Sequence, residues 1–160
     1  MKMLILTLAI FSSLFTFSQN LRSQEEIKFF NKEFIKLINI ERKKLNLDTL
    51  IESEELNTSS MGWSKECINS TKFDHSNIQK TKVNAECLDL GWVKHKCDKS
   101  VKRVVASFKS SDDHWSILMS KDYKYIGVGE YVKEGYMTVS DGKTTIREFG
   151  THSVTTVHLH

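Results

Sequence analysis

The sequence contains no proline, no Cys-x-x-Cys pair and no second long apolar run after its N-terminal segment. Proline normally makes up about 5% of a protein, but no functional class follows from its absence here. Without a Cys-x-x-Cys pair, a zinc site built from cysteines is not expected. Without a second apolar run, the chain after the N-terminal segment is expected to be soluble, with no membrane span.

An excess of charge of one sign is also lacking. The 160 residues carry 23 Lys and Arg against 20 Asp and Glu, which gives a formal net charge of +3. Such a small excess does not indicate nucleic acid or an anionic membrane surface as a partner. No repeat, low-complexity tract or interdomain linker divides the sequence, so we expect one domain.

The N-terminal segment has the pattern of a secretory signal peptide. Lys2 precedes an apolar stretch from Leu4 to Phe17, which is too short and too often interrupted by serine to span a bilayer. The absence of a cysteine directly after this segment argues against a lipoprotein anchor. We expect a secreted protein in the periplasm, outside the cell or at its surface. The predicted divisions are a signal peptide over 1–18, a domain over 19–150 and a tail over 151–160 that adds a strand or frays.

Three cysteines remain for an oxidising compartment, so one disulfide at most can form and one thiol is left over. Cys87 and Cys97 would close a short loop and are the first choice for that bond. The alternative is three reduced, partly buried cysteines.

Apolar spacing predicts helices first and strands afterwards. Ser23-Gln24-Glu25-Glu26 is a capping box that opens a helix to about Asn46. Ser53 opens a second helix, in which the small Ser59 and Ser60 allow another element to approach closely. Glu134-Gly135 and Asp141-Gly142 are hairpin turn signals. The other expected elements are a strand or turn over 83–92, helices over 101–108 and from the Ser-Ser-Asp-Asp-His-Trp segment, and strands over 123–132, 136–140 and 143–149.

Three residues stand apart from the packing pattern: His75 in a polar loop, Glu86 between small and apolar neighbours, and His114 at a helix start. Two neutral imidazoles are good ligands for zinc or another divalent cation, and a nearby carboxylate can hold a bound water or act as a base. The alternatives are capping and packing for His114, an exposed loop position for His75, and backbone hydrogen bonds for Glu86. The remaining C-terminal histidines, His152, His158 and His160, are expected to lie in a polar tail.

The order and setting of these residues resemble the CAP family, which comprises cysteine-rich secretory proteins, antigen 5 and pathogenesis-related 1 proteins. The match runs from about Phe34 to Ser140. In chain order its motifs are Asn39-Ile40-Glu41-Arg42, Ser60 with Trp63, His75-Ser76, Ala85-Glu86-Cys87-Leu88, Phe108-Lys109-Ser110-Ser111-Asp112-Asp113-His114 and Gly127-Val128-Gly129.

The resemblance implies an α+β fold: a CAP-like α-β-α sandwich with N-terminal helices packed on a C-terminal antiparallel meander. It also implies a shallow cleft with His75 and His114 as metal ligands and Glu86 as its carboxylate. Ser111 stands where the family's second glutamate falls, and Cys87 replaces the asparagine that follows the first. The neighbouring Asp112 and Asp113 either lie near the cleft in place of that glutamate or stabilise the helix dipole.

These observations favour a secreted CAP-domain protein whose His/Glu cleft binds a divalent metal and a small-molecule, lipid-like or peptide ligand, or a protein partner. One alternative is a metal-assisted hydrolase with Glu86 as catalytic base, and another is an interaction module without a site. The missing second glutamate and the lack of a third clear ligand favour binding over turnover.

Overall fold

The computed structural model describes residues 20–70, 73–78, 83–93, 100–140 and 145–160. The predicted signal peptide, the predicted turn at Asp141-Gly142 and Cys97 lie outside these residues. In chain order the elements are α1 (Gln24–Lys44), β1 (Ile51–Glu52), α2 (Glu54–Asn69), β2 (Ala85–Val93), α3 (Val101–Lys109), α4 (Asp112–Leu118), β3 (Tyr125–Ser140) and β4 (Thr145–Leu159).

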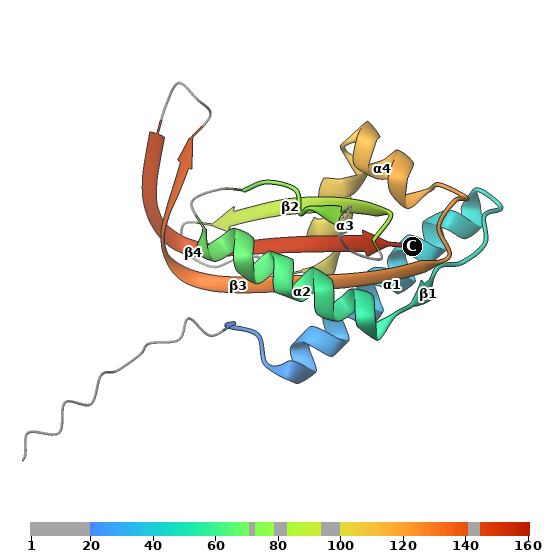
Figure 1. The fold of residues 1–160 in the computed structure, drawn as a ribbon, viewed down its shortest axis with the longest axis horizontal. Coiled ribbons are helices and arrows are strands. Elements are labelled where there is room, and N and C mark those ends of the chain that lie inside the picture. The colour runs from blue at the N-terminus through green and yellow to red at the C-terminus, as the bar shows by residue number, and fades with distance from the viewer. Residues whose placement is uncertain (1–19, 71–72, 79–82, 94–99, 141–144) are drawn as a thin grey trace, which may run out of the picture.

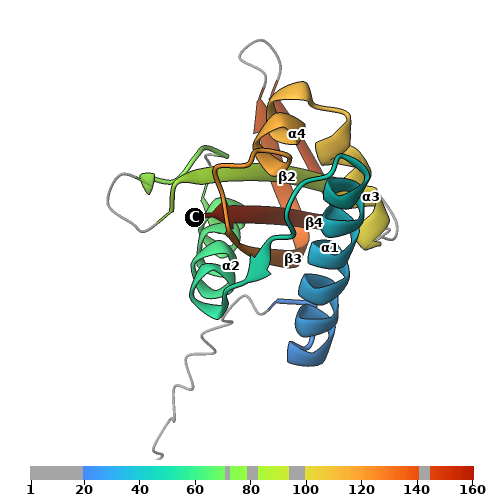
Figure 2. The same ribbon diagram turned by 90° about the vertical axis from the view of Figure 1, so that its right-hand side faces the viewer.

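The strands form a four-stranded sheet in the order β1-β3-β4-β2. The short β1 pairs with β3 in parallel, and the other two pairings are antiparallel. Helix α2 covers one face of the sheet, and α1 and α3 cover the other with α4 beside them (Figures 1 and 2). The predicted α+β class and three-layer sandwich are therefore confirmed.

Serine side chains begin three of the helices. Ser23 accepts a hydrogen bond from the Glu26 backbone N–H, and the Glu26 carboxylate accepts one from the Ser23 N–H, so the predicted capping box forms. Ser53 and Ser100 cap α2 and α3, and the side chain of each accepts one backbone hydrogen bond. The main core lies between α1, α3 and the sheet, and its most buried side chains include Phe34, Ile38, Val104, Phe108, Ile126, Val128, Val157 and Leu159.

Helix α2 lies directly on the backbone of β3. A Cβ atom added at Gly127 would come within 2.2 Å of the Leu56 carbonyl carbon, and one added at Gly129 within 2.2 Å of the Met61 nitrogen. The hydroxyl of Ser60 donates to the carbonyl of Gly127 at 3.2 Å, across the same contact. The prediction that a small residue of this helix lets another element approach closely is confirmed at Ser60.

Strands β3 and β4 are longer than the strands that the sequence predicts. Glu134-Gly135 is not a turn, because β3 continues through it and Gly135 pairs with Gly150 of β4. Gly135 has a φ of 156°, which glycine adopts without steric cost, so the strand stays extended there. Residues 151–159 complete β4, which lies between β2 and β3.

Candidate functional site

A pocket of about 380 Å³ forms where the segment 73–78, β2 and α4 meet. Its lining is His75, Ser76, Ile78, Glu86, Asp113, His114 and Ile117. The structure therefore brings together the two histidines and the glutamate that the sequence singled out, with one carboxylate beside them. The other two predicted neighbours, the N-cap residue Ser111 and the exposed Asp112, are not among the lining residues.

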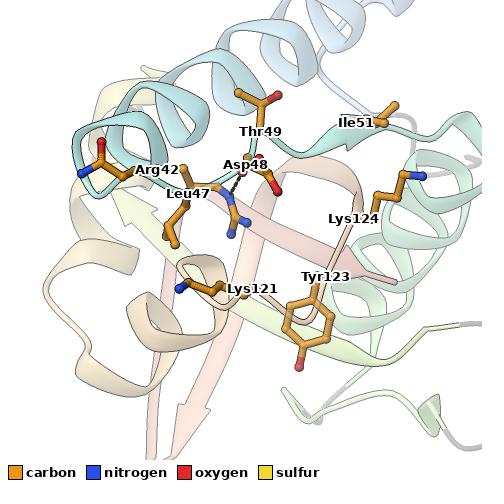
Figure 3. Close-up of a pocket in the computed structure, with 9 residues that line it drawn as sticks. Arg42, Leu47, Asp48, Thr49, Ile51, Lys121, Tyr123 and Lys124 are labelled. Atoms are coloured by element: carbon orange, nitrogen blue, oxygen red, sulfur yellow. Dashed lines mark hydrogen bonds between the residues drawn. The ribbon is translucent and has the colours of Figure 1, made fainter.

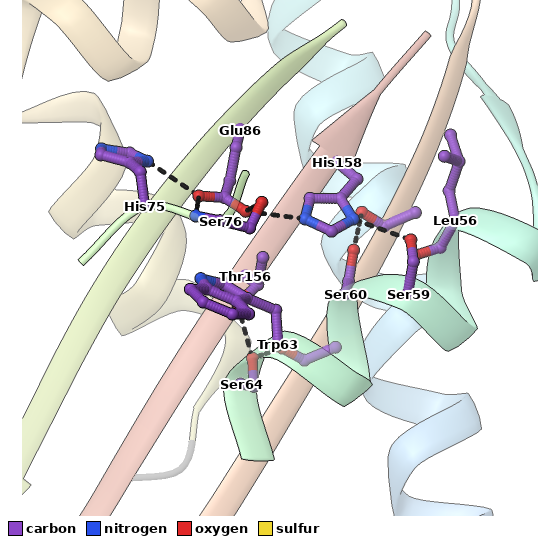
Figure 4. A network of polar contacts seen from close by, with 12 residues as sticks. Leu56, Ser59, Ser60, Trp63, Ser64, His75, Ser76, Glu86, Thr156 and His158 are labelled. Carbon is purple, nitrogen blue, oxygen red and sulfur yellow. Dashed lines mark hydrogen bonds and ion pairs between the residues drawn. The ribbon is translucent and has the colours of Figure 1, made fainter. Parts of the chain in front are cut away.

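Glu86 is the centre of the polar contacts in this pocket. It lies opposite His158 in the register of β2 and β4, and its side chain is 2% exposed. Oε1 accepts hydrogen bonds from His75 Nδ1 at 2.8 Å and from the Ser76 backbone N–H at 2.9 Å. Oε2 accepts from Ser76 Oγ at 2.5 Å and from His158 Nε2 at 2.9 Å (Figure 4).

These contacts decide the ionisation of Glu86. Burial by itself would raise the pKa of its carboxyl, but the hydrogen bonds from His158, Ser76 and His75 outweigh burial and lower the pKa to about 2. The group is therefore a carboxylate at neutral pH and can only accept hydrogen bonds. It follows that both His75 Nδ1 and His158 Nε2 carry a proton and donate.

His75 is held by one ring nitrogen and open at the other. Its side chain is 59% exposed, and its Nδ1 is fixed on Glu86. Among the described residues, nothing makes a hydrogen bond to His75 Nε2. In the neutral ring that nitrogen carries a lone pair, because Nδ1 has the proton. His75 is thus oriented to offer Nε2 as a ligand.

His114 both packs and lines the pocket. Its ring meets Phe108 edge to face, with 5.5 Å between the ring centroids and 83° between the planes. Its backbone carbonyl accepts a hydrogen bond from Cys87 Sγ. The side chain is half-buried and lines the same pocket as His75.

His158 was misplaced by the sequence analysis, which expected it in a polar tail. It is 3% exposed, and it bridges Glu86 and α2 because its Nδ1 lies 2.8 Å from Ser59 Oγ. A line of contacts therefore runs from Ser59 through His158 and Glu86 to His75 (Figure 4). The signal was present in the alternation of Val157, His158 and Leu159, which is typical of a strand with one polar face.

A metal site of three protein ligands is not formed by the part of the chain that the structure describes. No group of three His, Cys, Asp or Glu side chains there is arranged to hold an ion. The metal-ligating groups that line the pocket are the imidazoles of His75 and His114 and the carboxylates of Asp113 and Glu86, of which Glu86 already accepts four hydrogen bonds.

Among the described residues, Cys67 and Cys87 form no disulfide, and both are buried. Cys87 is 0% exposed, and burial raises the pKa of its thiol to about 12. Cys97 lies outside the described residues, so its pairing with Cys87 stays a prediction, which the position of Cys87 in the core does not favour.

The described residues have the fold of solved SCP-domain and cysteine-rich secretory proteins. The model of the cysteine-rich secretory protein family, CAP, matches residues 35–140. The chain belongs to this family. No curated protein matches the sequence.

Solved structures of the same fold come from extracellular and surface proteins. The chain resembles an extracellular protein containing an SCP domain from Bacillus anthracis, with a TM-score of 0.57 and 16% identity over 89% of this chain and 45% of that one. An outer surface protein from Borrelia burgdorferi gives a TM-score of 0.53 and 17% identity over 89% of this chain and 97% of that one. A cysteine-rich secretory protein from Staphylococcus aureus gives a TM-score of 0.57 and 16% identity over 88% of this chain and 41% of that one.

The chain thus spans less than half the length of the Bacillus and Staphylococcus proteins. Within the described residues, no helix is long and apolar enough to cross a membrane.

Proposed function

We propose that the chain is an exported CAP-domain binding protein whose pocket holds a divalent cation, with zinc as the first candidate, between His75 and His114. The ligand that this pocket serves is a small molecule, a lipid-like molecule or a peptide. Export is supported by the signal-peptide pattern of residues 1–18 and by the extracellular or surface origin of similar structures.

The observation that carries the proposal is the bond from His75 to Glu86. A carboxylate that accepts from one imidazole nitrogen fixes the ring and makes the other nitrogen a better metal ligand. Here Glu86 holds Nδ1 of His75 at 2.8 Å and leaves Nε2 without a partner among the described residues. His114 and Asp113 line the same pocket.

This donor set fits a cation bound through imidazole. Two nitrogens and at most one carboxylate leave coordination positions open, and a bound cation would offer them to water or to an oxygen of a ligand. The chain itself fixes His75 through Glu86 and fixes the backbone of His114 through Cys87.

The hydrolase alternative requires Glu86 to act as a base. Its carboxylate already accepts four hydrogen bonds, and its pKa is about 2. An effective general base has a pKa near the working pH. The geometry of Glu86 therefore supports orientation of His75 and not proton abstraction.

Calorimetric titration of residues 19–160 with zinc chloride tests the proposal. We expect one zinc per chain at pH 7 and weaker binding near pH 5, because protonated imidazoles do not bind metal. The His75→Ala/His114→Ala double variant should lose this binding while its circular dichroism stays unchanged.

A His160→Ala variant is the matched control, because His160 is exposed and is not among the residues that line the pocket. It should bind zinc like the wild type. If wild type and double variant titrate alike, the pocket is not a metal site and the interaction module without a site gains support.

A further inference from the structure

A second and larger pocket lies away from the His/Glu pocket and shares no lining residue with it. Its volume is about 540 Å³, within the range of small-molecule sites. It lies where the end of α1, the segment leading into β1 and the segment between α4 and β3 meet (Figure 3).

Arg42 contributes a buried charge to this pocket. It is 2% exposed. Its Nε donates to the Asp48 carbonyl at 2.7 Å, and its Nη1 donates to the carbonyls of Leu118 and Ser120, each at 2.8 Å. These acceptors are neutral backbone groups, so the guanidinium is held rigidly without an anionic partner.

The remaining guanidinium nitrogen of Arg42, Nη2, is the one that a ligand in the pocket can contact. Nη2 makes no hydrogen bond to any described residue, and no carboxylate among those residues lies within ion-pair distance of the guanidinium. Burial lowers the pKa of Arg42, and the charge of nearby Asp48, which raises that pKa, offsets only part of the effect. An anion in the pocket would reduce the remaining cost of the buried charge.

The turn after α1 forms the rim of the pocket. Leu47 and Asn46 donate backbone hydrogen bonds to the carbonyls of Arg42 and Lys43, at 3.0 and 3.1 Å, which is the pattern of a Schellman motif. Asn46 has a φ of 55°, which reverses the chain at this point. The segment after it therefore returns over the Arg42 side chain and carries the Asp48 carbonyl to its Nε.

The other lining residues favour a ligand with one charged and one apolar part. Lys121 and Lys124 are exposed at the edge of the pocket, and Asp48 is its one acidic lining residue. With Arg42 the pocket therefore has a net positive charge. The apolar lining consists of Leu47, Ile51 and Tyr123.

We propose that this pocket binds a small anionic ligand, in which a carboxylate or phosphate group meets Arg42, Lys121 and Lys124 and a short apolar body contacts Tyr123. Arginine donates to such groups from a fixed planar fork, and here the fork is already oriented by backbone carbonyls. The site is independent of cation binding at His75 and His114.

Titrations with phenyl phosphate and with benzoate test the proposal and separate the two anion types. Binding is followed by calorimetry and by amide chemical shifts of the full chain. We expect one-to-one binding of at least one probe, with shifts at residues 46–51 and 121–124. The Lys121→Ser/Lys124→Ser double variant should bind about tenfold more weakly, since it loses two charge contacts.

The matched control is Lys28→Ser/Lys32→Ser, which removes the same charge from exposed positions of α1. It should bind like the wild type, as should His75→Ala/His114→Ala. The proposal is overturned if neither probe binds, if the Lys121/Lys124 variant binds as tightly as the wild type, or if the control weakens binding equally.

Discussion

At the scale of single residues, the chemistry of the site depends on how Glu86 is satisfied. A carboxylate that is 2% exposed remains charged only because four donors surround it. Two of those donors are imidazoles from opposite directions: His75 from the pocket and His158 from the sheet. The same carboxylate thus stabilises the fold and orients a side chain of the site.

The low pKa of Glu86 predicts a pH dependence of stability. The carboxyl has a pKa of about 2 in the folded protein and about 4.3 in an unfolded chain. A lowered acid pKa stabilises the folded state fully above the unfolded value, and the gain is lost as the pH falls toward 2. Between pH 5 and pH 2 we expect the wild type to lose about 2–3 kcal/mol more than Glu86→Gln, which cannot titrate.

The measurement is urea unfolding of both proteins at several pH values. Glu25→Gln serves as the control, because Glu25 is exposed in the first turn of α1 and should show no comparable difference from the wild type. A gap in unfolding free energy between wild type and Glu86→Gln that is the same at pH 5 and pH 2 would contradict the assigned pKa.

At the scale of elements, the contact of α2 with β3 holds the site together. The helix reaches the sheet because glycine in the strand meets serine in the helix, and Ser64 Oγ donates to the Gly129 carbonyl at 2.8 Å. One turn before, Ser59 contacts His158, which in turn contacts Glu86. A displacement of α2 would therefore move Ser59 and, through His158, change the contacts of Glu86 in the pocket.

Two glycine substitutions separate this contact from helix propensity. A Cβ at residue 129 would lie 2.2 Å from the Met61 nitrogen, so Gly129→Ala must push α2 away and should cost about 2–3 kcal/mol. Gly62 is exposed on α2 with nothing within 4 Å of an added Cβ, so Gly62→Ala should stabilise by about 0.5–1 kcal/mol. Urea unfolding measures both, and equal effects would show that α2 does not rest on Gly129.

The sequence predicted elements where local signals are strong. The serine caps and apolar spacing located the helices, since both act within a few residues. The extent of the last two strands was predicted wrongly, because the turn signal at Glu134-Gly135 is overridden by pairing with residues far along the chain. The end of the chain was predicted as a polar tail because it contains polar side chains such as His158 and Thr156. In the structure these two side chains face α2 and form hydrogen bonds with its serines.

At the scale of the whole molecule, the site joins residues that are distant in sequence. His75, Glu86 and His114 were found in advance through their order in a family pattern, and the pocket contains all three. His158 lies 72 positions from Glu86, and no local pattern links the two. The pocket of Arg42 is equally non-local, since its walls come from residues 42–51 and 121–124. The pocket with imidazoles and a carboxylate and the pocket with cationic groups share no lining residue.

We propose that Glu86 fixes the His75 ring so that its Nε2 can bind a cation. Long-range proton–nitrogen NMR of the imidazole rings, recorded at pH 7 before and after addition of zinc, tests it most directly. We expect that His75 carries its proton on Nδ1 in both spectra and that zinc shifts the Nε2 resonances of His75 and His114. A His75 ring protonated on Nε2, or Nε2 resonances that zinc leaves unchanged, would contradict it.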